Sequence, residues 1–111
     1  MTSVPVAGPL LAICVPTFNR ASSLHNLFRS LGAVKARFGY EVEICISNNG
    51  STDDTRVVVE DFAREHAADV RHQVSNIGGT LNIIAVAGQM RARWGIWCGD
   101  DDELDLEAIG R

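Results

Sequence analysis

The sequence predicts an α/β protein with an open, mainly parallel sheet and flanking helices. Short apolar runs alternate along the 111 residues with segments whose apolar residues recur at helical spacing. The resulting order of strand, helix, strand, helix, strand, helix, strand is typical of right-handed crossovers in a parallel sheet. The composition, 46% hydrophobic and 22% charged, is that of a globular domain.

The first half of the chain contains two expected strands and one expected helix. Residues 10–16 form a continuous apolar run, typical of a strand covered on both faces. Residues 21–32 then place apolar side chains at helical spacing, with Gly32 as the expected end of that helix. Residues 40–47 alternate in polarity and predict the second strand.

The second half repeats this pattern. Residues 48–55 lead into a helix for which Ser51 or Thr52 is the expected cap, with Asp53 and Asp54 in its first turn. A short strand is expected over residues 70–74. Residues 81–90 are rich in Ile, Val and Ala and predict a well-buried helix, and residues 94–98 predict the fourth strand.

Composition also limits the class of protein. A net charge of −4 gives no reason to expect a nucleic-acid partner. Residues 1–9 are expected to be a leader, and residues 10–111 a single unit. The chain lacks both a basic leading segment and an apolar run of about 20 residues, so we expect no signal peptide, no transmembrane segment and a cytoplasmic location. The cysteines, odd in number and widely spaced, are expected to be buried reduced thiols; they are Cys14, Cys45 and Cys98.

Four polar loops follow the four expected strands, at residues 17–20, 47–54, 75–80 and 99–103. The carboxyl ends of parallel strands share one edge of the sheet, and ligands of such sheets bind there. The connections at the opposite edge resemble ordinary solvated turns. We therefore expect the functional site at the edge that carries these four loops.

The individual loops permit more than one interpretation. Asp100, Asp101 and Asp102 are suited to a divalent cation, but acidic residues also stabilise the start of a helix. The amides of Asn48 and Asn49 are suited to reading a base edge, although a turn followed by a helix also explains this loop. The loop at residues 75–80 offers backbone N–H groups for an anion but lacks the spacing of a P-loop.

Taken in order, three segments resemble the nucleotide-binding half of family 2 glycosyltransferases with the Rossmann-like GT-A fold. They are "ICVPTFNR", "EVEICISNNGSTDDT" and "SNIGGTLNIIAVAGQMRARWGIWCGDDDEL", which together extend over most of residues 10–104. The resemblance implies a nucleoside diphosphate sugar as donor and Mg or Mn as the divalent cation. The cation would stabilise the charge that develops on the leaving diphosphate.

The resemblance also assigns roles to residues of this sequence. Pro16, Thr17 and Asn19 would border the base and ribose, and Asn48 and Asn49 would lie at the base. In the DXD-like aspartate cluster, Asp100 would contact the ribose or sugar and Asp101 would bind the metal ion, with Asp102 as a second candidate ligand.

Two departures from the family pattern affect these expectations. The family usually has at least one aspartate where this chain has Asn48 and Asn49, which leaves the preferred base open. The family also extends further than residue 111, and the additional part supplies the acceptor site and, in inverting members, the catalytic base. We therefore expect no catalytic residue within residues 1–111, and a fragment that binds nucleotide and metal without transferring sugar.

A sheet without its second half is expected to expose apolar surface, so we predict a homo-oligomer formed through that surface. Two alternative functions remain. A nucleotidyltransferase would carry a glycine-rich basic loop after the first strand, which residues 17–23 lack. A non-enzymatic nucleotide-binding or scaffold domain would use its aspartates only as helix caps.

Overall fold

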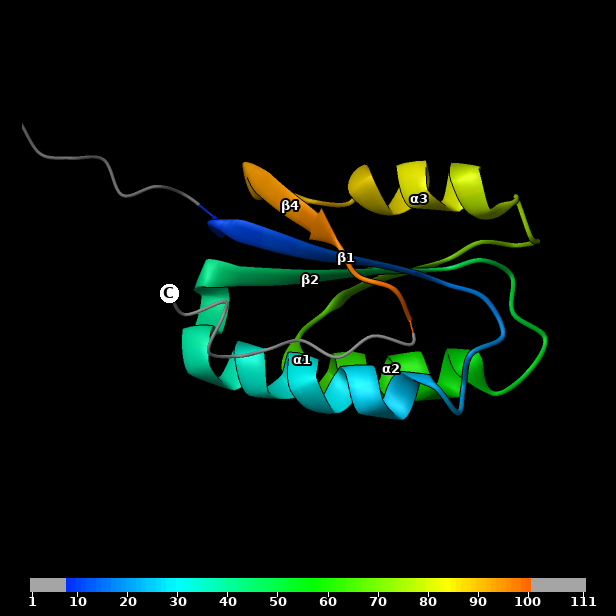
Figure 1. Cartoon of the computed structure of the whole chain (residues 1–111), viewed down its shortest axis with the longest axis horizontal. Helices are drawn as coiled ribbons and strands as arrows, with labels where there is room; N and C mark the ends of the chain where they lie inside the picture. Colours follow the sequence, from blue (N-terminus) through cyan, green and yellow to red (C-terminus); the bar gives the residue numbers. More distant parts are fainter. Residues whose placement is uncertain (1–7, 101–111) are drawn as a thin grey trace, which may run out of the picture.

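A computed structural model describes residues 8–100, which form one parallel sheet with helices on both faces (Figure 1). Its elements are β1 (Leu11–Thr17), α1 (Leu24–Phe38), the single-turn 3-10 helix η1 (Gly39–Glu41), β2 (Val42–Asn48), α2 (Thr55–His66), β3 (Asp69–His72), α3 (Gly79–Ala87) and β4 (Trp94–Trp97). The strands lie in the order β3-β2-β1-β4, and all three pairs are parallel. The predicted fold class and the alternation of strands and helices are confirmed.

The helices divide the core into two layers. In Figure 1, α1 and α2 cover one face of the sheet and α3 covers the other. Alternate residues of the central strands enter the two layers: Ile13 and Ile44 face α1 and α2, whereas Cys14 and Cys45 lie on the α3 side. Both faces of β1 are therefore apolar, as the continuous run in residues 10–16 predicted. The strand β2, whose sequence alternates in polarity, is nevertheless buried at all seven positions. Cys14, Cys45 and Cys98 are buried thiols outside any disulfide of the described residues, as predicted.

The prediction that the first helix ends at Gly32 is wrong. The helix α1 continues to Phe38, and Gly32 lies at its contact with α2. A Cβ atom at Gly32 would lie 2.9 Å from Nε2 of His66, so the missing side chain makes room for the imidazole ring. The helix ends instead at Gly39, whose positive φ of 59° is readily adopted by glycine and whose N–H donates to the carbonyl of Lys35.

The predicted cap of the second helix is also wrong. The helix α2 begins at Thr55 with Asp54 at its N-cap, and the Asp54 side chain makes no capping hydrogen bond. The hydroxyls of Ser51 and Thr52 accept hydrogen bonds from Asn19 in the loop after β1. These two residues therefore join neighbouring loops, which is a tertiary role that local capping rules do not anticipate.

The third helix is less buried than predicted. Of the residues of α3, only Asn82 and Val86 are buried. Leu81, Ile83 and Ile84 are exposed, as are all four residues of the edge strand β4. Within residues 8–100, no helix is long and apolar enough to cross a membrane.

Candidate functional site

The loops that follow β1, β2 and β3 meet at the carboxyl edge of the sheet, together with the start of the segment after β4. A cleft of about 270 Å³ lies among them. Its lining residues are Pro16, Thr17, Phe18, Arg20, Asn49, Gly79, Asn82, Ile83 and Asp100. The structure thus brings four of the predicted residues together: Pro16, Thr17, Asn49 and Asp100. Asn19 and Asn48 are not among the lining residues.

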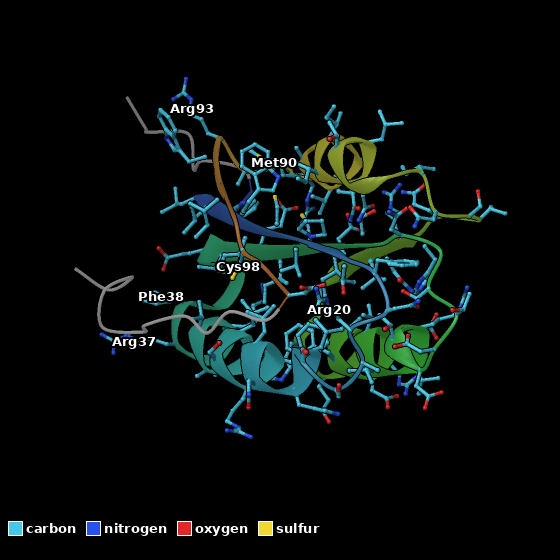
Figure 2. The ribbon with its side chains drawn as sticks, turned by 45° about the vertical axis from the view of Figure 1, so that its right-hand side comes forward. Arg20, Arg37, Phe38, Met90, Arg93 and Cys98 are labelled. Carbon is cyan, nitrogen blue, oxygen red and sulfur yellow. The ribbon has the colours of Figure 1, made fainter. Side chains whose placement is uncertain are left out.

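One wall of the cleft carries a carboxylate next to a hydroxyl. Thr17 Oγ1 donates to Asp100 Oδ2 at 3.0 Å, and Thr17 itself is buried at the end of β1. The chain reaches this position because the N–H of Cys98 donates to the carbonyl of Cys14, which continues the β4 segment along β1. Figure 2 shows Cys98 between the sheet and the layer of α1 and α2, and Asp100 follows two residues later.

A cation lies beside the same carboxylate. Arg20, in the loop between β1 and α1 (Figure 2), places its Nε 3.7 Å from Asp100 Oδ1. The Arg20 side chain is 52% exposed and the Asp100 side chain 17% exposed, so solvent weakens their attraction. A guanidinium at this position carries charge and donors suited to a phosphate.

Asn19 connects the loop after β1 to the loop after β2. Its φ is 50°, a left-handed conformation that asparagine tolerates better than most residues. Its backbone N–H donates to Ser51 Oγ at 2.9 Å, and its Oδ1 accepts the N–H of Thr52 at 2.8 Å. The Asn19 side chain is therefore engaged with the neighbouring loop.

The same junction includes Asp53. Its carboxylate accepts the hydroxyl and the N–H of Thr55. These hydrogen bonds, that of the hydroxyl above all, lower the pKa of Asp53, since they favour the charged form. The helix dipole of α2 also stabilises a negative carboxylate at its N-terminal end.

Asn48 and Asn49 point to different neighbours. Asn48 donates through Nδ2 to Nδ1 of His72 and accepts the hydroxyl of Ser51, and it lines a separate hollow of about 480 Å³ between the ends of β2 and β3. Asn49 lines the cleft with Thr17, and its side chain hydrogen bonds to residues 76–78. The two adjacent asparagines therefore do not lie on one surface as a paired reader of a base.

The cleft offers part of a site for a hard divalent cation. Asp101 and Asp102, the predicted metal ligands, lie outside the described residues. Among residues 8–100, no group of three or more His, Cys, Asp or Glu side chains is placed to hold a metal ion. Mg²⁺ commonly takes one or two protein carboxylates and completes its shell with water and phosphate oxygens. The Asp100 carboxylate beside the Thr17 hydroxyl would supply one carboxylate of such a shell, so these residues are compatible with a cation that takes its other ligands elsewhere.

Four lining residues were missed by the sequence interpretation: Phe18, Gly79, Asn82 and Ile83. Asn82 is buried, accepts the hydroxyl of Ser47 at 2.7 Å and donates to the Ser47 carbonyl at 3.0 Å, which holds α3 against β2. Its signal in the sequence is a single polar residue inside the otherwise apolar run "LNIIAVA". Such a residue in a buried position requires a polar partner.

Comparisons with known proteins connect this geometry to a family. The sequence profile of glycosyl transferase family 2 matches residues 12–111. Abequosyltransferase RfbV of Salmonella typhimurium is 28% identical over 102 residues, which is 90% of this chain and 30% of that protein. Undecaprenyl-phosphate 4-deoxy-4-formamido-L-arabinose transferase of Pseudomonas fluorescens is 33% identical over 83 residues, which is 75% of this chain and 24% of that protein. The chain therefore spans less than a third of either relative.

Solved structures share the fold. The structure of residues 1–349 of S. aureus TarS in complex with UDP aligns with this chain with a TM-score of 0.82 and 24% sequence identity. The aligned part covers 91% of this chain and 30% of the TarS chain. The structure of a mannosyltransferase of Pyrobaculum calidifontis in complex with GDP-Man and Mn²⁺ aligns with a TM-score of 0.77 and 16% sequence identity. The aligned part covers 95% of this chain and 31% of the mannosyltransferase chain.

Proposed function

Because the chain belongs to glycosyl transferase family 2, we propose that its cleft binds the nucleotide part of a nucleoside diphosphate sugar. The observation that carries this proposal is the Thr17–Asp100 pair at the carboxyl ends of the strands, beside the N-terminal end of α3. Ligands of open parallel sheets bind at this edge. The UDP complex of TarS and the GDP-Man complex of the mannosyltransferase support the class of ligand.

The walls of the cleft suit the parts of such a donor. Pro16 and Phe18 offer apolar contact for a base or ribose, and Asp100 accepts hydrogen bonds from sugar hydroxyls. The Arg20 guanidinium, exposed beside Asp100, is suited to the diphosphate. Binding of a phosphate would compete with the Arg20–Asp100 contact and release the carboxylate for the sugar or a cation.

We also propose that Mg²⁺ or Mn²⁺ binds with the diphosphate, through Asp101 with Asp102 as a second candidate. The Mn²⁺ complex of the mannosyltransferase supports this choice of ion. When bound, the ion would offset the negative charge on the leaving diphosphate. In this proposal the Asp100 carboxylate, which accepts the hydroxyl of Thr17 in the cleft, orients the donor.

The proposed activity of the whole protein is transfer of the sugar to an acceptor hydroxyl. Among residues 8–100, no carboxylate other than Asp100 lines the cleft, so the catalytic base is not assigned to a described residue. We therefore propose that residues 1–111 bind donor and cation without turnover. The cytoplasmic location remains a prediction.

The exposed apolar residues of α3 and β4 support the predicted self-association. This surface, the α3–β4 surface, comprises Leu81, Ile83, Ile84, Trp94, Ile96 and Trp97. The strand β4 carries apolar residues on both faces, although it lies at the edge of the sheet. An exposed edge of this kind pairs readily with another chain. We propose that two copies associate through it.

Calorimetric titration with UDP, GDP, CDP and TDP, each with Mg²⁺, tests the proposed function. We expect saturable binding that weakens at least about tenfold in Asp100→Ala and Thr17→Val, since each substitution removes a polar partner from the cleft. Asn26→Ala, on the exposed side of α1, is the matched control and should bind as the unchanged chain does. A chain that binds none of these nucleotides would favour the scaffold alternative.

A further inference from the structure

Asn49 directs its side-chain amide toward one short loop. Its Nδ2 donates to Asn76 Oδ1 at 2.9 Å and to the carbonyl of Gly78 at 3.4 Å, and its Oδ1 accepts the N–H of Ile77 at 2.8 Å. The residue is 3% exposed. A primary amide has two N–H donors, and both have protein acceptors here. Neither N–H is left to read the edge of a base, and Oδ1, the atom that would accept a ring N–H, already accepts the N–H of Ile77.

The residue that follows Asn49 brings the same loop close. Gly50 has a φ of 67°, and a Cβ atom at this position would lie 2.5 Å from the carbonyl carbon of Ser75 and 2.7 Å from the nitrogen of Asn76. The backbone of residues 75–76 therefore packs directly on Gly50, where no larger residue fits. Asn49 and Gly50 together form the packing surface for residues 75–78.

The backbone of Asn49 connects this packing surface to the opposite wall of the cleft. Its N–H donates to the carbonyl of Thr17 at 2.9 Å, and the hydroxyl of Thr17 contacts Asp100. On the other side, Gly78 is the N-cap of α3, and Gly79, the first residue of that helix, lines the cleft. Asn49 thus joins the wall that carries Thr17 and Asp100 to the wall formed by α3.

We propose that Asn49 is a positioning residue that fixes the distance between the two walls of the cleft, and that it does not read the base. This inference rests on the proposed function only in that the ligand of the cleft is taken to be a nucleotide. It differs from the role that the family resemblance implies for this position, in which Asn49 contacts the base directly.

The orientation of Asn76 explains why asparagine, and not aspartate, suits position 49. Oδ1 of Asn76 also accepts the N–H of Gly78 at 2.7 Å, so this oxygen is held toward Asn49. A carboxylate at position 49 would face two oxygen acceptors, Asn76 Oδ1 and the Gly78 carbonyl, with no hydrogen between them. Rotating the Asn76 amide would place its NH₂ against the N–H of Gly78.

The substitution Asn49→Asp gives opposite results under the two roles. If Asn49 positions the loop, Asn49→Asp weakens the binding of UDP, GDP, CDP and TDP, each with Mg²⁺, by a similar factor of about ten, since buried acceptors lose their donor. If Asn49 reads the base, the new carboxylate strengthens the hydrogen bond to the ring N–H of UDP and TDP and changes the order of affinities. A selective gain for UDP and TDP would overturn the proposal.

Hydrogen exchange gives a readout that needs no nucleotide. In Asn49→Ala, the N–H of Ile77 loses its acceptor and should exchange at least about tenfold faster, while Asn26→Ala leaves it unchanged. Unchanged exchange at Ile77 would overturn the positioning role. If the unchanged chain binds no nucleotide, the proposed function fails, and the exchange measurement still decides the role of Asn49.

Two further variants separate positioning from general stability. Val59→Ala destabilises the buried face of α2 without touching the cleft, so it should lower the melting temperature and leave nucleotide affinity unchanged. Asn76→Ala removes the acceptor from the other side, so Asn76→Ala and Asn49→Ala should both weaken the binding of all four nucleotides by a similar factor. Equal affinity losses in Val59→Ala and Asn49→Ala would overturn the proposal, as would full affinity in Asn76→Ala.

Discussion

Glu43 provides a stability prediction that depends on pH. Its side chain is 4% exposed on β2, and it anchors the turn between α3 and β4. Oε1 accepts the N–H of Arg91 at 2.7 Å and that of Ala92 at 3.1 Å, and Oε2 accepts Nε of Arg91 at 3.0 Å. The substitution Glu43→Gln keeps one oxygen for the two backbone N–H groups but removes the charge and presents an NH₂ to the guanidinium.

The magnitude follows from these contacts. The Arg91 side chain is 78% exposed, so its ion pair contributes at most about 1 kcal/mol. A hydrogen bond to a charged acceptor contributes about 1.5–3 kcal/mol to stability, and one between neutral groups contributes about 0.5–1.5 kcal/mol. In Glu43→Gln, the hydrogen bonds of the two backbone N–H groups change from a charged acceptor to a neutral one. The two N–H groups together lose about 2–3 kcal/mol and the ion pair up to about 1 kcal/mol, so we expect Glu43→Gln to lower the free energy of unfolding by about 2–4 kcal/mol at pH 7.

The sign of the pH dependence follows from the pKa of Glu43. Burial by itself raises this pKa, but the N–H groups of Arg91 and Ala92 together with the guanidinium outweigh burial, and the pKa is lowered. The stabilisation from the charged form is therefore complete above the unfolded value of about 4.3 and is lost as the pH falls through the folded value. The advantage of the unchanged chain over Glu43→Gln should shrink between pH 7 and pH 3.

Urea unfolding followed by far-ultraviolet circular dichroism at pH 7, 5 and 3 measures this difference. Asn26→Ala is the control, and its free energy of unfolding should differ from that of the unchanged chain by a pH-independent amount. A difference between Glu43→Gln and the unchanged chain that stays constant or grows toward pH 3 would refute the reasoning.

Three other perturbations have defined outcomes. Gly50→Ala should cost about 2 kcal/mol or more, because the residue has a positive φ and its Cβ would collide with the backbone of residues 75–76; urea unfolding at full stability would contradict this. Phe62→Ala should cost about 3–5 kcal/mol, since its ring is buried and stacks on Phe28 at 4.3 Å; a loss below about 1 kcal/mol would contradict that packing. Trp97→Lys should shift the sedimentation of the concentrated chain toward monomer by placing a charge on the α3–β4 surface, whereas an unchanged distribution, or monomer alone before substitution, would contradict self-association.

The sheet and its helices follow from local patterns, which is why they could be predicted. The continuous apolar run at residues 10–16 indicates a strand buried on both faces, and this holds for β1 in the core. The run at residues 94–98 has the same composition, yet β4 lies at the edge with its side chains exposed. Composition predicts a strand, but the neighbours that a strand acquires depend on the whole chain.

The errors concern residues whose partners are distant in sequence. Glycine is common at the end of a helix, but at Gly32 the imidazole of His66 occupies the space that a side chain would fill. Serine and threonine are common helix caps, but the hydroxyls of Ser51 and Thr52 accept hydrogen bonds from Asn19 instead. Local rules describe what a residue is able to do, and tertiary contacts select among those roles.

The candidate site could be located from sequence, but its internal connections could not. The order of strands and loops placed Thr17, Asn49 and Asp100 at one edge, and the structure brings them to one cleft. The hydrogen bonds that connect the loops, such as those from Asn49 to residues 76–78, depend on side-chain geometry. Spacing along the chain carries no information about these connections.

Binding of a nucleoside diphosphate in the cleft is the central claim, and nuclear magnetic resonance of the ¹⁵N-labelled chain tests it most directly. On titration with UDP and Mg²⁺, we predict saturable shifts of the amides of Thr17, Asn49 and Gly79, which line the cleft. The hollow of about 410 Å³ between α1 and α2, lined among others by Phe28 and His66, serves as the internal control and should show none. Shifts confined to that hollow, or no saturable shifts at any amide, would contradict the account.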